Sequence, residues 1–170
     1  MDLLVVRHAI AESREEFARS GGEDDAERPL TPEGRRKFEK GARGLRKLAG
    51  GVELLATSLL ARATQTSDIL EAQWPGKLRV VRLRELAPET DPAALLGWLR
   101  RHRRRKLVAV VGHEPHLSRL VELALTGRSS EFVDLKKGGA CLLSLGKSPR
   151  AGGATLRWLL TPAQLRRLGR

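Results

Sequence analysis

The sequence predicts an α/β fold with three layers, in which helices cover both faces of a mostly parallel central sheet. Residues 3–6 and 107–111 are continuous apolar runs, which are typical of strands buried on both faces, as in parallel sheets. Segments with the apolar spacing of helices lie between the predicted strands. A chain of 170 residues with no internal repeat and no linker fits one domain, residues 1–170.

The first strand, residues 3–6, leads into a polar stretch at residues 11–28 that has no stable periodicity. We predict a loop with one helical turn there, and its length suits a rim beside a functional site. The next helix is predicted to end at about residue 48, because Thr31 suits its N-cap and Pro32 suits its first position.

The middle of the chain predicts two strands and two helices. Residues 52–57 form the second strand, and Ser58 is expected to cap the helix that follows. Apolar and basic residues alternate at 78–83, as they do in an edge strand. Asp91 and Pro92 then begin another helix.

The last third begins with the buried strand at residues 107–111, and Pro115 fits the first turn of the helix after it. Residues 140–145 and 154–160 are apolar enough to pair as strands across a turn rich in Gly and Pro. Thr161 is expected to cap the final helix.

The composition is strongly basic, with a formal net charge of +12 and a pI of about 11.1. This charge predicts attraction to polyanions or to phosphorylated partners. Nucleic-acid binding is disfavoured, because aromatic residues make up only 4%, Tyr is absent and the basic residues are spread along the chain. The one dense basic run, residues 100–106, is typical of a solvated helix end.

Cysteine usage and apolar segments bear on the compartment. The single cysteine, Cys141, excludes an internal disulfide framework, and we expect it to be a small buried side chain without a catalytic role. No apolar run approaches the roughly 20 residues of a membrane span, and the short first run does not resemble a signal peptide. We therefore predict a cytoplasmic protein without a membrane partner. A monomer is favoured, although the sequence does not fix the oligomeric state.

Two of the predicted strands end beside a histidine. Arg7 and His8 follow the first strand, and His113 follows the strand at residues 107–111. In open α/β sheets, ligands bind just outside the carboxyl ends of the strands. Arg presents a planar fork of donors that matches phosphate, and a neutral His ring is a nucleophile near neutral pH. This recurrence predicts a phosphate site at which His8 attacks.

Three further residues are candidates for the same site. Arg62 lies near the start of a helix that follows a strand, where free N–H groups and the helix dipole attract anions. Arg28 lies just before a helix and could swing toward a bound anion, with an exposed loop position as the alternative. Glu85 is a candidate general acid if it points into the site, and the alternative is an exposed or ion-paired carboxylate.

Separated segments of the chain resemble the motifs of one family. Arg7-His8-Ala9 resembles the Arg-His-Gly signature of the histidine phosphatase superfamily, which is also called phosphoglycerate mutase-like. Residues 58–66 resemble its Ser-Pro-x-x-Arg-Ala-x-Gln-Thr segment. Ala9 replaces the usual Gly, and Leu59 replaces the usual Pro.

The third segment narrows the resemblance. Residues 111–113 are similar to the region of the family's second histidine. The short chain, residues 28–31 and the sequence His113-Glu114-Pro115 resemble the small phosphohistidine phosphatases of the SixA type.

The resemblance implies a phosphatase that needs neither metal nor cofactor, in which His8 takes the phosphoryl group and water then releases it. The groups around the phosphoryl oxygens would be Arg7, Arg28, Arg62 and His113. Glu85 would be the general acid, with Glu114 as the alternative. The implied substrate is a protein phosphohistidine, and a small phosphomonoester or pyrophosphate is the alternative.

Two other interpretations compete with this one. His113, Glu114 and His116 could ligate zinc, since histidines at i and i+3 can share a helical face, but the spacing differs from the His-Glu-x-x-His motif. The other is a basic phosphate-binding or nucleic-acid-binding module without catalysis. That module predicts salt-sensitive binding to polyanions and no phosphate release.

Overall fold

The computed structural model describes residues 1–74, 76 and 78–170. Its middle layer is a six-stranded sheet with the strand order β3-β2-β4-β1-β5-β6. The strands are β1 (Asp2–Arg7), β2 (Leu54–Thr57), β3 (Arg79–Arg82), β4 (Leu107–Gly112), β5 (Ala140–Ser144) and β6 (Thr155–Leu160). The predicted edge strand is therefore β3, at one border of the sheet.

The sheet is mostly parallel, as predicted. The strands β3, β2, β4 and β1 pair in parallel, and β5 pairs in antiparallel fashion with both β1 and β6. Arg7 at the end of β1 is the register partner of Gly112 at the end of β4. This register brings His8 and His113, the next residue of each strand, out of the sheet side by side.

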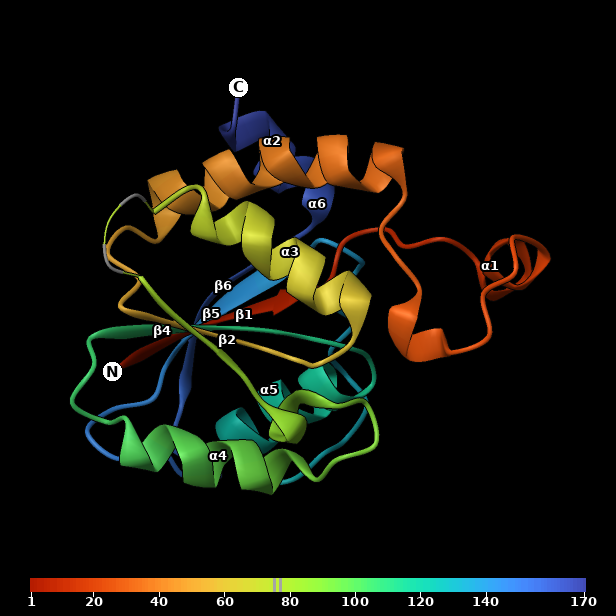
Figure 1. Ribbon diagram of the computed structural model, residues 1–170. Coiled ribbons are helices and arrows are strands. Elements are labelled where there is room, and N and C mark those ends of the chain that lie inside the picture. Colours follow the sequence, from red (N-terminus) through yellow and green to blue (C-terminus); the bar gives the residue numbers. More distant parts are fainter. Residues whose placement is uncertain (75, 77) are drawn as a thin grey trace.

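Helices cover both faces of the sheet (Figure 1). One face carries α2 (Pro32–Leu48), α3 (Ala61–Glu71) and α6 (Pro162–Leu168), and the other carries α4 (Pro92–Arg101) and α5 (His116–Thr126). The short helix α1 (Arg14–Arg19) projects from the carboxyl edge of the sheet. Two 3₁₀ turns complete the elements, η1 (Asp25–Glu27) and η2 (Arg84–Leu86).

Alternate residues of β1 serve two separate cores, because successive side chains of a strand point to opposite faces. Leu4 and Val6 belong to the core under α2, α3 and α6, together with Phe38. Leu3 and Val5 belong to the core under α4 and α5. All four β1 side chains are completely buried, which confirms the prediction of a strand covered on both faces. The three-layer α/β fold is confirmed with it.

Some helix ends lie where the sequence predicts them, and others do not. Thr31 caps α2 by accepting from Gly34 N–H at 2.9 Å, and Thr161 caps α6, as predicted. Ser58 is not the cap of α3, which begins at Ala61 after Leu60. The Ser58 N–H instead donates to Val111 O at 3.0 Å, so the backbone still bonds to β4 one residue beyond the end of β2.

Two more predicted boundaries change. Pro115 is the N-cap of α5 and does not lie in its first turn. The stretch at residues 11–28 holds both α1 and η1, so it is more ordered than a loop with one turn. Ser13 and Glu16 form a capping box that starts α1. An antiparallel bridge between Ala11 and Leu30 closes this excursion at its base.

No helix in the described part of the chain is long and apolar enough to cross a membrane.

Candidate active site

His8 and His113 face each other at the carboxyl edge of the sheet. Their ring centroids are 5.0 Å apart, and the rings are tilted by 51°. Both are buried, with exposed fractions of 6% and 2%. The sequence predicted this pairing from the two strand ends, and the geometry places the two rings beside each other.

The hydrogen bond of His8 determines its tautomer. Nδ1 lies 2.7 Å from Ala9 O, and a carbonyl oxygen can only accept, so Nδ1 carries the proton. Nε2 therefore keeps a lone pair. Burial lowers the pKa of His8 to about 3, and the charges of Arg62, Arg7 and Lys137 work in the same direction. The ring is neutral and nucleophilic throughout the physiological pH range.

His113 is also held neutral. Burial lowers its pKa to about 3, and His8 and Arg62 contribute in the same direction. Neither of its ring nitrogens has a hydrogen-bond partner within the described chain. A buried ring with unpaired polar atoms beside a second neutral imidazole is suited to contact an oxygen atom of a ligand.

Arg7 is fixed by a segment far away in the sequence. Its Nη1 donates to Leu135 O at 2.6 Å. The Gly138 N–H donates to Arg7 O at 3.2 Å and to His8 O at 3.0 Å. We call residues 134–138 the strap, because these bonds tie it across the end of β1.

The strap contributes a cation that the sequence analysis missed. Partial burial lowers the pKa of Lys137, and the neighbouring charges of Arg7, Arg28 and Arg62 lower it further. The charge of Lys137 in turn helps to lower the pKa of His8. No motif marks this lysine, since only the strap's bonds to β1 bring it to the site.

Arg62 and Arg28 meet on one carboxylate. Arg62 is 5% exposed, and its Nη2 lies 3.2 Å from Asp25 Oδ2. Arg28 Nε donates to Asp25 Oδ1 at 2.8 Å. Although burial opposes ionisation, both guanidinium groups hold the pKa of Asp25 below its usual range. Asp25 was missed as a site residue, and its only sequence signal is an acidic cluster in a long loop.

Thr66 belongs to the segment at residues 58–66 that resembles the second family motif, and its hydrogen bonds show what this part of the motif does. Its hydroxyl accepts from Ala9 N–H at 3.0 Å and donates to Arg62 O at 2.7 Å. Gln65 Oε1 accepts from Leu30 N–H at 2.8 Å. These residues join α3 to the backbone after His8 and to the base of the loop that carries Asp25.

The two candidate acids occupy different environments. Glu85 lies in η2, half-buried, and its backbone oxygen accepts from Thr90 Oγ1 at 3.1 Å. Glu114 directly follows His113, and burial raises its pKa while the charge of Arg7 opposes that rise. Its Oε1 is buried without a hydrogen-bond partner among the described residues. Glu114 therefore fits a proton donor better than Glu85 does.

A second buried carboxylate orders the chain that leads into the strap. Glu122 is completely buried, and its two oxygens accept four backbone N–H groups, from Ser130, Glu131, Phe132 and Val133, at 2.7–2.9 Å. Burial opposes ionisation, but the four donors outweigh it and lower the pKa of Glu122.

Residues 1–74, 76 and 78–170 include no group of three or more His, Cys, Asp or Glu side chains that could hold a metal ion. His113, Glu114 and His116 do not converge in this way. Cys141 is buried in β5, as expected.

Comparison with known proteins identifies the family. The profile of the histidine phosphatase superfamily (branch 1) matches residues 3–88, which run from β1 to just beyond η2. The chain belongs to the histidine phosphatase superfamily. An uncharacterised protein from Picosynechococcus sp. is 36% identical over 149 residues, which cover 86% of each chain.

Solved structures support the same assignment of the fold. The structure of the protein histidine phosphatase SixA complexed with tungstate has a TM-score of 0.83 at 23% identity, covering 97% of this chain and 99% of that one. The alpha-ribazole phosphatase from Shigella flexneri has a TM-score of 0.72 at 18% identity, covering 95% and 97%. The phosphoglycerate mutase-like, SixA-type fold predicted from the motifs is confirmed. Membership of this histidine phosphatase superfamily supports a phosphatase activity.

Proposed function

We propose that this chain is a metal-independent phosphatase that carries the phosphoryl group on His8 and takes it from phosphohistidine in proteins. The observation that supports this most directly is the 2.7 Å bond from His8 Nδ1 to Ala9 O, because it leaves Nε2 as a neutral nucleophile among cations. Family membership supports the reaction type, and the substrate is our own step.

In the first step, His8 Nε2 attacks phosphorus in line. A bond forms between Nε2 and phosphorus while the bond from phosphorus to the leaving imidazole nitrogen breaks. Arg7, Arg62 and Lys137 stabilise the charge on the phosphoryl oxygens, so that side chains supply the positive charge that this transfer needs. The leaving imidazole takes one proton from Glu114.

In the second step, a water oxygen attacks the phosphorus of phospho-His8. One water proton passes to the Glu114 carboxylate, the Nε2–phosphorus bond breaks, and its electron pair returns to Nε2. Inorganic phosphate leaves. We assign the acid–base role to Glu114 rather than Glu85, because Glu114 directly follows His113, its Oε1 is buried without a hydrogen-bond partner among the described residues, and its pKa is raised.

Two arguments favour phosphohistidine over a phosphomonoester. Imidazole is a good leaving group and makes modest demands on the general acid. The fold is that of a structure described as a protein histidine phosphatase, although 23% identity supports only the fold.

The test is phosphate release by the wild type and by His8→Ala, with a chelator present. The substrates are a histidine-phosphorylated protein and an aryl phosphate, and His102→Ala at the far end of the molecule is the control. We expect His8→Ala to lose roughly 10⁶-fold in turnover, as removal of a nucleophile does elsewhere. A substrate that carries a radioactive phosphoryl group should label His8 of the wild type and should not label the variant.

Four results would contradict the proposal. Turnover retained by His8→Ala would exclude His8 as the phosphoryl carrier. Loss of activity with chelator would restore the metal interpretation. Polyanion binding without any turnover would indicate a binding module, and a clear preference for the aryl phosphate would favour a small-molecule substrate.

A further inference from the structure

A groove rich in cations lies between α2 and α6, outside the site described above. It has a volume of about 640 Å³. We call it the cationic groove, and its basic residues are Arg36, Lys37, Lys40, Arg43, Arg166 and Arg170. Glu33 and Glu39 are its two acidic residues. The groove therefore has a strong positive excess, with carboxylates set among the cations.

The crossing of the two helices creates this groove. A Cβ atom on Gly44 would overlap Leu165 O, so the helices touch at this point. Arg36, Lys40 and Arg43 follow each other at helical spacing along one side of α2, over roughly 10 Å. All three side chains are exposed, and Arg36 and Lys40 make no ion pair within the described chain. Their charges are available to a partner.

A second cavity of about 210 Å³ adjoins the cationic groove on the side of the proposed reaction site. Lys37 and Arg166 line both spaces. The second cavity extends to Ala9, the residue after His8, and to Lys137 of the strap. Its walls also include the apolar side chains of Ile10, Phe38 and Pro162. Lys137, Lys37 and Arg166 thus line the way from the end of β1 to the cationic groove.

We propose that the cationic groove docks an acidic surface of the phosphorylated protein substrate while its phosphohistidine lies at His8. This inference rests on the proposed function and adds a specificity surface to it. A phosphoryl group needs only the cations around His8, so the additional charges between α2 and α6 fit anionic groups elsewhere on a large substrate.

The mixture of charges favours a protein over a nucleic acid. Lys37 forms an ion pair with Glu33 at 2.6 Å, and Glu39 is also among the lining residues. A continuous phosphate backbone would meet these carboxylates, whereas a protein surface can place its own basic groups there. The apolar walls beside Ala9 likewise suit a side chain rather than a phosphate.

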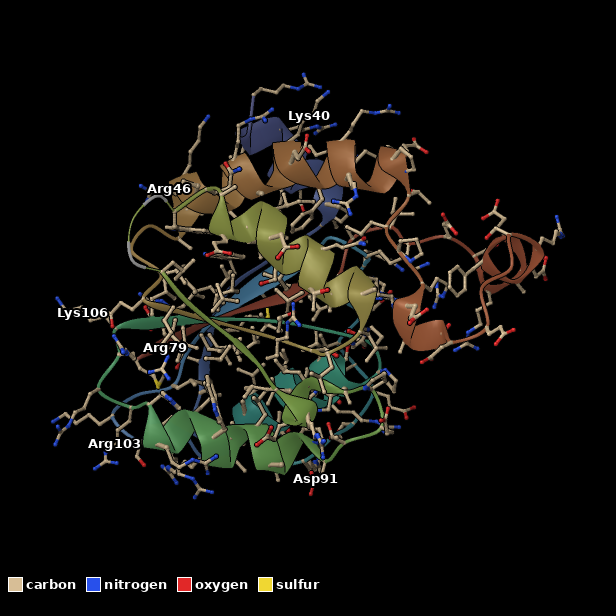
Figure 2. All side chains as sticks on the ribbon, in the orientation of Figure 1. Lys40, Arg46, Arg79, Asp91, Arg103 and Lys106 are labelled. Atoms are coloured by element: carbon tan, nitrogen blue, oxygen red, sulfur yellow. The ribbon has the colours of Figure 1, made fainter. Side chains whose placement is uncertain are left out.

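The molecule contains a matched control for the charge argument. A second basic cluster surrounds Glu53 and the segment from Arg101 to Arg105. It lies at the amino ends of β2 and β4, opposite the proposed reaction site. Figure 2 shows Lys40 on α2 and Arg103 beyond the end of α4, on opposite sides of the sheet. Charge reversal at the two places changes the net charge equally.

The experiment compares Arg36→Glu/Lys40→Glu with Arg103→Glu/Arg104→Glu. Each enzyme is assayed on an acidic histidine-phosphorylated protein and on free phosphohistidine, at low and high salt. For the α2 pair, we expect KM for the protein to rise roughly tenfold at low salt and the difference to shrink at high salt. Its kcat/KM on free phosphohistidine and all values of the control pair should stay within about twofold.

An equal rise in KM for both pairs would overturn the docking surface and leave only an effect of net charge. No rise in KM for the α2 pair would also overturn the docking surface. Calorimetric binding of the same phosphoprotein to His8→Ala, with and without the α2 substitutions, tests docking independently of turnover. If the enzyme shows no turnover but docking still depends on Arg36 and Lys40, the proposed function is refuted and the docking surface is not. A single-stranded oligonucleotide that displaces the phosphoprotein through these two residues would assign the groove to nucleic acid instead.

Discussion

At the scale of single residues, buried histidines make the stability of this protein depend on pH. His116 is completely buried, and burial lowers its pKa from 6.5 to about 4. Between these two values the unfolded chain binds more protons than the native chain does. Stability therefore rises with pH across this window, and it is lost as the pH falls from 7 toward 4.

We predict that His116→Leu reduces this acid sensitivity. The wild type should lose about 2 kcal/mol of unfolding free energy through His116 alone between pH 7 and pH 5. The leucine variant should lose that much less, because leucine has no proton to bind. Urea unfolding at the two pH values measures the difference, with the partly exposed His102→Ala as the control. Equal losses in wild type and His116→Leu would show that His116 is not held neutral.

The raised pKa of Glu114 leads to a prediction for the pH dependence of catalysis. A carboxyl whose pKa is raised donates its proton only below that pKa, so kcat/KM should fall as the pH rises through it. Glu114→Gln should remove this alkaline fall and cost roughly 100-fold on an alkyl phosphate, but less than about tenfold on phosphohistidine. Both enzymes are assayed on one substrate, whose own ionisation is then common to the two profiles. The same fall in Glu114→Gln would return the role to Glu85.

At the scale of elements, the contact between α2 and α6 depends on missing side chains at Gly44 and at Gly169, where a Cβ would overlap Lys40 O. Gly44 Cα lies against the backbone of α6, where a Cβ would overlap Leu165 O. At Gly41, one turn earlier in α2, a Cβ would lie 3.7 Å from Leu165 Cβ, which is an ordinary contact. The same substitution should therefore have opposite effects at the two positions.

We expect Gly41→Ala to stabilise the protein by about 0.5–1 kcal/mol, because alanine favours the helix. Gly44→Ala should destabilise it by roughly 2–3 kcal/mol, since the helices must move apart and buried contacts are lost. Chemical denaturation of the two variants beside the wild type measures both signs. Stabilisation by Gly44→Ala would mean that α6 does not pack here.

Elements whose signals are local could be predicted from the sequence. The apolar run of β1 and the Thr31–Pro32 start of α2 depend on a few consecutive residues, and both were correct. Ser58 was wrong because its N–H is taken by Val111, a residue 53 positions away that no local rule includes. The Ser13–Glu16 capping box was a local signal that went unread in a loop without periodicity.

The candidate site also divides into residues with a local sequence signal and residues that tertiary contacts bring in. His8 and His113 could be paired from sequence, because parallel neighbouring strands end at one edge. Asp25 and Lys137 could not, since they reach the site only through tertiary contacts. The bridge between Ala11 and Leu30 closes the loop that carries Asp25, and the strap reaches β1 through the carbonyl of Leu135 and the N–H of Gly138, backbone groups that carry no recognisable motif.

At the scale of the whole molecule, β5 lies inside the sheet between β1 and β6. Cys141 in this strand is the register partner of Val5 on one side and Leu159 on the other. Its side chain is completely buried in the core under α4 and α5, and burial raises the pKa of the thiol to about 12. A thiolate cannot form or be reached unless strands and helices separate together.

Cys141 should therefore report global unfolding. We predict that an aromatic disulfide reagent at pH 8 modifies no thiol in the native protein on the timescale of minutes, and one thiol per chain in denaturant. Under native conditions, the labelling rate should rise with urea in parallel with the equilibrium population of unfolded chain, because the open state must expose β5. Gly44→Ala should accelerate labelling and Gly41→Ala should slow it, although neither residue is in the core that contains Cys141. Rapid labelling that is independent of urea would mean that β5 opens locally, and that the two cores do not unfold as one unit.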